Sequence, residues 1–533
     1  MRPFLIFVLA CSFWAGGSDL LLLPRGFASQ EDEGRSPLPT PKPPDAENPA
    51  SWQVHNHTGV VLLRAGHLQE AVSEFRKALE LQPDYTDALY NLGTTLNRLG
   101  DHAGASASLQ AALKLRPDFP EAEEELGSAL AQTGDFEGAI LAFRGAIRQR
   151  PGVVKPRLEL GRLYGRIGDK AGAVAEFREA ISIDPNSSEA HINLGEALRQ
   201  SGDLEGAIAE FQRAVTIDSN SISGLRNLAE ALGDQDKWDE SIQYYGRIVS
   251  LQPGSGGAHT IFGYALKRAG KLNEASDELR KGITLSPELG AAHFYLAEIL
   301  FQTGDAAAAL PEYEKACELN PRDAEFSRKF GLALSKIRPQ DAMVEIKRSI
   351  GLDPRNAAAH QILAQLLRRT GDLQGSSAEL QKAKDLDQEE ERHSDAAAHV
   401  KAAAQYIRKN DTGDGIKELR LALAAEPDSP EANHLLGVAL SAAGKWSEAD
   451  NAFQIALQKK PSDPQIHFNF GVSLGHQQDW VGAVREFRSA VSLRPGYAQA
   501  HCLLASALAH KGDVRASANE LALAKEFGPC GSE

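Results

Sequence analysis

Cysteine is scarce in this sequence, which has four cysteines in 533 residues. Four is few for an exported protein, and Cys11 lies in an N-terminal segment that we expect to be removed. Cys317 directly follows Ala316 in a predicted helix and is expected to be an inert core thiol. Cys502 and Cys530 lie at the two ends of one predicted helical hairpin. Because those ends meet in space, we predict a disulfide between them.

Motifs for catalysis are also lacking. The sequence contains no nucleophile elbow, no glycine loop that grips phosphate and no zinc motif. It therefore predicts a protein that is not an enzyme and that has no cofactor and no metal site. Any activity associated with it would belong to a partner.

Positive charge is in deficit, because the formal net charge is −15 at pH 7. Such a field repels a phosphate polyanion, so we expect no generic nucleic-acid binding. Long apolar runs are lacking beyond residue 28, so the remaining chain is expected to be soluble. A membrane would be involved only if the N-terminal segment were kept as an anchor.

Residues 1–28 have the pattern of a signal peptide. Arg2 precedes an apolar run, and small residues at 26 and 28 stand at the spacing that a signal peptidase accepts. An uncleaved anchor and lipidation at Cys11 are the alternatives. Residues 29–51 are charged and then proline-rich, which predicts an extended, disordered linker. We therefore expect an exported protein, in the periplasm, in the cell envelope or secreted.

Proline recurs every 34 residues, and this period organises the rest of the chain. The recurring prolines are Pro83, Pro117, Pro151, Pro185, Pro253, Pro287, Pro321, Pro427, Pro461, Pro495 and Pro529. A small residue stands 24 positions before most of them, for example Gly59, Gly93, Gly127, Gly161, Gly195, Gly263, Gly437 and Gly471. A large apolar residue stands eight positions before, for example Phe75, Phe143, Phe177, Phe211, Phe453 and Phe487. Each period therefore predicts two amphipathic helices that cross closely at a small residue.

With this period and small–large pattern, the chain resembles the tetratricopeptide (TPR) repeat family. We count fourteen repeats, with repeats one to ten at 52–390, a charged insertion at 391–395 and repeats eleven to fourteen at 396–531. The resemblance implies an all-α fold, a right-handed α-solenoid in which the first helix of each pair lines the inner, concave surface. The arrays carried by large sugar-transferring enzymes are similar, but those enzymes need a second, catalytic domain, for which we expect no room here.

The insertion at 391–395 is the largest departure from the pattern. No glycine or proline occurs from residue 376 to 410, so one helix could run through it; a solvated loop is the alternative. Five extra residues rotate the next hairpin by about 140° at ~100° per residue. We therefore predict that a bend, a looped-out segment or a longer helix absorbs this rotation.

Eight of the fifteen histidines fall at position 4 of the repeat, counting position 1 as the third residue after the recurring proline. They are His55, His191, His259, His293, His360, His399, His467 and His501. One interpretation is that these histidines bind metal ions in an array along the repeats. One histidine per repeat, with no cysteine or carboxylate expected nearby, favours semi-buried packing histidines instead.

Positions 2, 6, 9 and 13 of the first helices share one face, which the resemblance places on the concave side. The asparagines at position 6 resemble the ladder with which TPR superhelices hold an extended peptide backbone, since an amide both donates and accepts. The ladder is incomplete, because Glu125 and Glu159 occupy the same position. The candidate ligand-binding residues are Asn91, Asn193, Asn227, Asn469, Arg98, Arg166, Glu196 and Glu230.

The sequence thus favours a non-enzymatic scaffold that binds another protein or a peptide as an extended chain, in the groove of repeats two to six. A cell-envelope assembly or polysaccharide-export scaffold is the alternative. We expect none of the asparagines Asn91, Asn193 and Asn227 to lie on the packing face, so that replacing all three by alanine should leave the fold intact.

Overall fold

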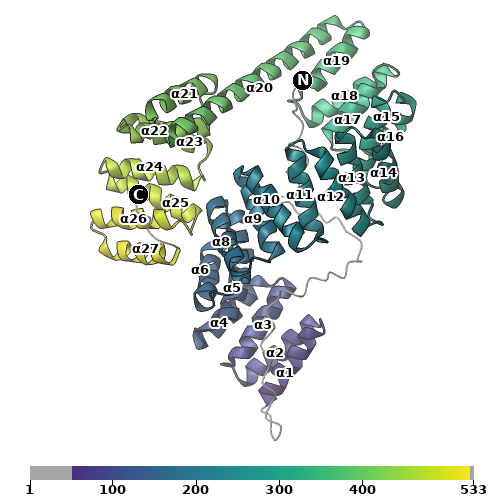
Figure 1. Cartoon of the computed structure of the whole chain (residues 1–533). Helices are drawn as coiled ribbons and strands as arrows, with labels where there is room; N and C mark the ends of the chain where they lie inside the picture. The colour runs from purple at the N-terminus through teal and green to yellow at the C-terminus, as the bar shows by residue number, and fades with distance from the viewer. Residues whose placement is uncertain (1–50, 410, 528–533) are drawn as a thin grey trace. The chain divides into compact units, whose positions relative to one another are not determined.

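The computed structural model describes residues 51–409 and 411–527, and in these ranges it consists of 27 α-helices with no strand (Figure 1). The residues before 51, which include the predicted signal peptide, lie outside the described part. Ser51, which the sequence analysis assigned to the linker, is already the first residue of α1. None of the described helices is long and apolar enough to cross a bilayer.

The helices alternate between a first and a second member of a hairpin. The first helices are α1 (Ser51–Arg64), α3 (Thr86–Leu99), α5 (Pro120–Thr133), α7 (Lys155–Arg166), α9 (Ser188–Ser201), α11 (Ile222–Asp234), α13 (Gly256–Arg268), α15 (Gly290–Gln302), α17 (Ala324–Leu334), α19 (Ala357–Arg369), α22 (Pro430–Ala442), α24 (Pro464–His476) and α26 (Ala498–His510). The second helices are α2 (Leu68–Leu81), α4 (His102–Leu115), α6 (Phe136–Gln149), α8 (Lys170–Ile183), α10 (Leu204–Ile217), α12 (Trp238–Leu251), α14 (Leu272–Leu285), α16 (Ala306–Leu319), α18 (Pro339–Leu352), α21 (Thr412–Ala425), α23 (Trp446–Lys459), α25 (Trp480–Leu493) and α27 (Val514–Phe527). The predicted all-α solenoid of helix pairs is confirmed.

Many hairpins are held by the predicted contact between a small and a large residue. In the fifth repeat, a Cβ added to Gly195 would lie only 2.5 Å from a ring carbon of Phe211, so the ring packs directly on the backbone of α9. Leu109 meets Gly93 in the same way in the second repeat, with 2.6 Å to the added Cβ. Both large side chains are fully buried. A bulkier residue at the glycine would therefore force the two helices apart.

In many hairpins the turn follows from a glycine and an aspartate. Gly100 ends α3 with φ 84°, a left-handed conformation that costs glycine little. The carboxylate of Asp101 then accepts a hydrogen bond of 3.0 Å from the backbone N–H of Gly104 and caps α4. The same pair of devices recurs at Gly202 and Asp203.

The charged insertion is part of one continuous helix, α20 (Leu373–Arg408), which is 36 residues long. Of the three ways of absorbing the extra residues, the structure shows the longer helix. Figure 1 shows α20 as a single long rod that is both the partner of α19 and the partner of α21. Its two ends thus serve as the second helix of the tenth repeat and the first helix of the eleventh.

The chain divides into two compact units within α12, one up to Tyr244 and one from Tyr245 onward. Each unit is a stack of hairpins in which a helix packs on its own partner and on the next hairpin. The predicted right-handed superhelix remains a prediction.

Candidate functional site

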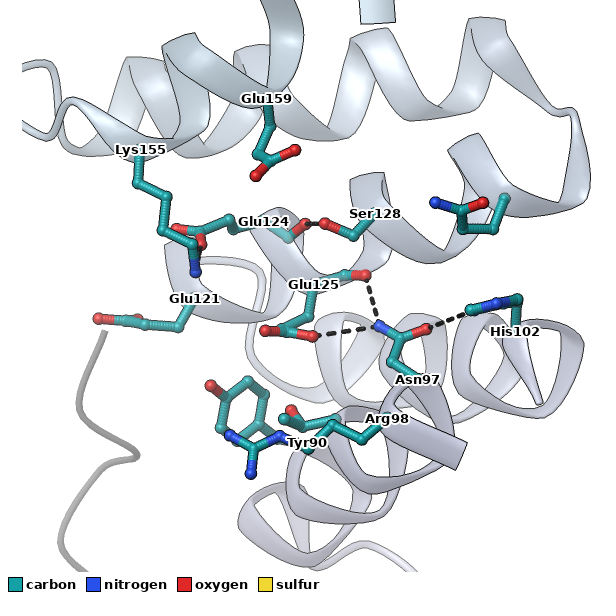
Figure 2. Close-up of a pocket in the computed structure, with 12 residues that line it drawn as sticks. Tyr90, Asn97, Arg98, His102, Glu121, Glu124, Glu125, Ser128, Lys155 and Glu159 are labelled. Atoms are coloured by element: carbon teal, nitrogen blue, oxygen red, sulfur yellow. Dashed lines mark hydrogen bonds and ion pairs between the residues drawn. The ribbon is translucent and has the colours of Figure 1, made fainter. Parts of the chain in front are cut away.

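A cavity of about 320 Å³ lies in the first unit, on the first helices of repeats two, three and four (Figure 2). Its lining comes mainly from positions 2, 5, 6, 9, 12 and 13 of α3, α5 and α7, which include the four positions singled out in the sequence. The lining residues are Tyr90, Thr94, Asn97, Arg98, His102, Glu121, Glu124, Glu125, Ser128, Gln132, Lys155 and Glu159. The cavity therefore has a polar wall in which four carboxylates face two full cations.

Three of the four carboxylates already have a cationic partner. Glu124, which is buried, forms an ion pair with Lys155 across the cavity. Burial raises the pKa of Glu124, although Lys155 opposes the shift. Glu159 accepts a hydrogen bond of 3.0 Å from Arg162, and Glu121 pairs with Arg150. These contacts fix the acidic side chains in the wall.

Glu125 is the carboxylate that stands apart. Its Oε2 accepts a hydrogen bond of 3.1 Å from the amide of Asn97, and the same amide donates to the Glu125 carbonyl oxygen at 3.0 Å. Figure 2 shows this fork, with His102 beside Asn97 on the right and Glu159 near the top of the view. Within the described residues Glu125 forms no ion pair. Its half-buried negative charge is oriented by an amide but is not neutralised.

Tyr90 and Arg98 complete the opposite side of the cavity. The Tyr90 ring is buried, and burial raises the pKa of its hydroxyl, with Glu125 adding to the shift. Arg98 is exposed, and within the described residues it forms no ion pair. The cavity therefore offers one free carboxylate and one free guanidinium on neighbouring helices. Such an arrangement suits a ligand that carries both polar backbone groups and charged side chains.

The asparagines at position 6 lie differently from what the ladder predicts. Asn91 is 4% exposed, and its amide donates a hydrogen bond of 3.1 Å to Asn56, whose own amide donates to the Tyr85 hydroxyl at 3.2 Å. The expectation that Asn91 lies away from the packing face is therefore wrong. Asn91 is buried because Asn56, at position 5 of the preceding repeat, lies beside it and accepts its hydrogen bond.

Two of the other three asparagines also contact the preceding repeat. Asn227 donates to Glu196 at 3.1 Å, which brings two of the predicted ligand-binding residues together. Asn469, in the second unit, lies 2.8 Å from Nε2 of His434. The amide nitrogen of Asn193 is buried and has no hydrogen-bond partner in the described residues. Their use for peptide binding remains a prediction.

Among the predicted charged residues, only Arg98 lies at the cavity. Arg166 donates to the carbonyl oxygen of Ala131 at 3.2 Å, and its guanidinium lies 5.7 Å from the centre of the Phe136 ring. Burial raises the pKa of Glu230, while Arg199 and Arg226 oppose the shift. Cys530 lies outside the described residues, so its disulfide with Cys502 also remains a prediction.

Sequence reasoning missed the place of Glu125 in the cavity wall, since it treated this residue as a gap in the ladder. It also left out positions 5 and 12, which supply Tyr90, Glu124 and Asn97. These positions flank the chosen face on a helical wheel, and a wider face would have included them.

The histidines at position 4 are packing residues, but one expectation about them is wrong. Each has a carboxylate beside it, a glutamate 19 residues later in the second helix; His191 and Glu210, 2.6 Å apart, are an example. Two side chains do not complete a metal site. The described residues contain no group of three or more side chains that could hold a metal ion.

Comparison with known proteins gives a family match over more than half of the chain. The description of the matching family is "Tetratricopeptide repeat", and the matched residues are 46–86, 58–107, 90–153, 158–222, 262–324, 400–464, 434–497 and 468–529. Among curated proteins, none matches the chain significantly.

Several solved structures are similar to parts of the chain or to most of it. One is MamA, residues 41 to the end, from Desulfovibrio magneticus RS-1, which is 20% identical and has a TM-score of 0.31. That match covers 32% of this chain and 97% of MamA. A second is TTC0263, a thermophilic TPR protein from Thermus thermophilus, with 23% identity, a TM-score of 0.29 and coverages of 34% and 98%. A third is a chain of the APC/C hetero-tetramer Cut9–Hcn1, with 15% identity, a TM-score of 0.32 and coverages of 86% and 96%.

Proposed function

Because the chain belongs to the tetratricopeptide repeat family, whose members are protein-interaction scaffolds, we propose that it binds an extended polypeptide along the first helices of repeats two to four. A single hairpin has little surface of its own, but stacked hairpins present a continuous face along which an extended chain can lie. We propose further that the scaffold is non-enzymatic and exported.

The single observation that supports this site most is the carboxylate of Glu125. It lies in a cavity large enough for a side chain, it is held by Asn97, and within the described residues it has no cationic partner. A lysine or arginine side chain of the ligand would neutralise it. A charge-assisted hydrogen bond in a half-buried site contributes about 1.5–3 kcal/mol. We therefore propose that the polypeptide carries a basic residue that enters the cavity.

The surrounding groups suit the backbone of the same polypeptide. Ser128 and Gln132 lie on the same helix as Glu125, and Asn97 lies on the first helix of the preceding repeat, so amide and hydroxyl groups line the path on both helices. Arg98 would attract an acidic residue or a carbonyl oxygen further along. Each contact is weak, and binding over several repeats would add them through a high effective concentration.

The test uses a library of random peptides displayed on phage and selected on the chain without its N-terminal segment. We expect enrichment of lysine or arginine at one position. The variant Glu125→Gln should bind the selected peptides about tenfold more weakly, as expected for ~1.4 kcal/mol. Glu137→Gln, at an exposed position on the second helix of the third repeat, makes the same change of charge outside the cavity and should bind normally.

If no peptide is enriched, or if Glu125→Gln and Glu137→Gln bind the selected peptides equally well, the cavity is not the binding site. Circular dichroism of both variants shows whether the fold is retained, so that a loss of binding can be assigned to the side chain.

A further inference from the structure

Eight histidine–glutamate pairs recur with the same geometry inside the hairpins. In each pair Nδ1 of the histidine at position 4 lies 2.5–2.7 Å from Oε2 of the glutamate 19 residues later. The pairs are His55–Glu74, His191–Glu210, His259–Glu278, His293–Glu312, His360–Glu379, His399–Glu418, His467–Glu486 and His501–Glu520. Each pair joins the first helix of a hairpin to the second.

In six of these pairs the other ring nitrogen also faces an acceptor. Nε2 lies 2.8–3.1 Å from the carbonyl oxygen of the proline six residues earlier. The six histidines are His191, His259, His293, His360, His467 and His501. A proline carbonyl has no proton to give, and an ionised carboxylate only accepts. A neutral imidazole beside an ionised carboxylate has only one N–H and can satisfy only one of the two contacts. Both contacts are therefore satisfied only when the site carries one additional proton.

One of the two remaining pairs, His399–Glu418, lacks this second contact for a visible reason. Residue 393, six before His399, lies inside the continuous helix α20, where its carbonyl belongs to the helix. The corresponding residue before His55 lies outside the described part of the chain. The proline carbonyl before the first helix is thus what completes the site.

Repeats without a histidine at position 4 act as internal controls. Asn433 occupies position 4 in the twelfth repeat and donates to the carbonyl oxygen of Pro427 at 3.1 Å, and the residue 19 positions later is Ala452. Arg157, a permanent cation, has Glu176 at that offset, 3.1 Å away. Position 4 thus holds a neutral donor where the glutamate is absent and a cation where the glutamate is present. This indicates that the glutamate balances a positive charge.

The ninth repeat, which is one residue short, gives the reverse case. Ser327 stands at position 4, and the nearest glutamate of the second helix is Glu345. Burial raises the pKa of Glu345, although Arg348 opposes the shift. At Glu278 burial also favours a higher pKa, but hydrogen bonds from Lys281 and His259 outweigh it, so that the pKa is lowered. His259 therefore contributes to keeping Glu278 ionised.

The charged groups that face these sites are few. The second carboxylate oxygen pairs with a cation three residues later in three of the six sites, through Arg213, Lys281 and Lys382 at 2.7–3.1 Å. In the site of His467, Arg485 bonds Glu486 at 2.8 Å and Asp463 adds a nearby negative charge. Glu312 and Glu520 are the charged partners of His293 and His501. Five of the six histidines are buried, so solvent screens them little.

We propose that these six sites are a proton-binding array, in which each hairpin takes up one proton on folding and loosens when alkaline pH removes it. The proton joins three segments, namely the turn that carries the proline, the first helix and the second helix. Without it, a ring lone pair would face an acceptor at about 3 Å, and the contact would become repulsive.

The direction of the effect can be worked out at His467. Burial alone would lower the pKa of His467, but the hydrogen bonds to Glu486 and to the carbonyl of Pro461 outweigh burial, so the pKa is raised. Because the pKa of His467 is higher in the folded chain than in the unfolded chain, its contribution to stability is fully present at pH values below the unfolded pKa of about 6.5. The contribution is lost as pH rises through the folded pKa. The pKa of Glu486 is lowered, since His467 and Arg485 outweigh burial, so its contribution is lost as pH falls. The hairpin is thus most stable between the two limits.

The test replaces the six glutamates by glutamine. A glutamine amide can donate to Nδ1 of a neutral histidine, whose Nε2–H still donates to the proline carbonyl, so the contacts remain without the extra proton. We expect the Tm of the wild-type chain to fall by several degrees between pH ~6 and ~9, and the fall to be at least halved in the six-fold variant. The matched control replaces six exposed glutamates, Glu137, Glu205, Glu274, Glu288, Glu314 and Glu391, and should keep the wild-type slope.

Equal slopes in the six-fold variant and in the control would overturn the proposal. If the six-fold variant does not fold, wild-type protein labelled with 15N-histidine gives the answer directly. At pH about 8, at least the six histidines of these sites should have both ring nitrogens protonated. A spectrum in which every histidine is neutral at that pH would equally overturn it.

Discussion

Position 15 of the repeat, where the first helix ends, shows what one residue contributes to a hairpin. In ten repeats a glycine with positive φ occupies this position. Asp236 and Gln478 occupy it in the sixth and thirteenth repeats, with φ of 58° and 64°. The left-handed conformation costs an L-residue about 1–2 kcal/mol, because its Cβ approaches the following carbonyl. The turn forms there all the same, since the packed helices on either side impose it.

We predict that Gln478→Gly stabilises the thirteenth repeat by about 1 kcal/mol, because glycine adopts this conformation without strain. Asp236 is less suitable, since its carboxylate accepts a hydrogen bond of 3.1 Å from the Trp238 ring. The measurement is the free energy of unfolding in urea.

The converse substitution is Gly444→Gln, at the same position of the preceding repeat, where φ is 72° and no atom lies within 4 Å of the added Cβ. It should destabilise by a similar amount. Gains or losses of the same sign in both variants would show that φ is not the cause.

Single residues also show where sequence reasoning ends. The glycine–phenylalanine crossing could be predicted, because both partners lie within one period and sterics leave few choices. The burial of Asn91 could not, because it depends on Asn56 in a neighbouring repeat. The glutamate 19 residues after each histidine can be read from the sequence. Its pairing with the histidine, however, becomes apparent only when the two helices of a hairpin are considered together.

At the scale of the element, α20 is unusual because most of its middle is open to solvent. From Lys384 to Asp395 its residues are largely exposed, whereas Ala383, Ala396 and Ala403 are buried against the neighbouring hairpins. The middle of the helix therefore depends mainly on its own backbone hydrogen bonds and on helix propensity.

We predict that Glu391→Pro breaks α20 without unfolding the repeats on either side. Proline removes the N–H that an α-helix donates to the carbonyl four residues earlier, at a cost of about 3 kcal/mol. Limited proteolysis should then cut between residues 385 and 395, and most of the helical circular dichroism should remain. Glu391→Ala, which keeps the backbone donor, should resist the protease as the wild type does.

The last hairpin, α26 with α27, has no described helix after it to cover the outer face of α27. We predict a disulfide between Cys502 and Cys530 that joins its two ends. For a loop of this size the gain in stability is about 3 kcal/mol. Digestion without reductant should yield a peptide pair linked through these cysteines, and Cys530→Ser should lower the unfolding temperature.

Cys317 provides the control for that experiment. It is a buried free thiol, and burial raises its pKa to about 12, so it should stay unlabelled by alkylating reagents in the folded protein. Rapid alkylation of both Cys502 and Cys530 in oxidised protein would contradict the bridge.

For the whole molecule, the repeat architecture makes stability a sum over neighbours. Within each of the two units a hairpin packs on the next, so a change in one repeat is felt mainly by the repeats beside it. The fold could be predicted from the sequence because the same small–large rule is repeated many times, and errors in single repeats do not matter. The candidate site could be predicted only as a face, since contacts between repeats decide which carboxylate lacks a cationic partner.

The cellular location of the whole chain depends on its N-terminal segment. We propose that residues 1–28 are removed and that the mature protein begins close to Ser29, outside the cytoplasm. N-terminal sequencing of the native protein should then give SQEDE as its first residues. Replacing Leu5 and Leu9, in the apolar run that follows Arg2, by arginine should leave the segment uncleaved and the protein in the cytosol, because the run could no longer enter the membrane.

Three results would each identify a different outcome. An intact Met1 on protein from the membrane fraction would indicate an anchor, since the apolar segment would then remain in the bilayer. A mature chain beginning at a lipid-modified Cys11 would indicate lipidation. An intact Met1 on protein from the cytosol would refute export, and the binding partner should then be sought among cytosolic chains with an exposed basic segment.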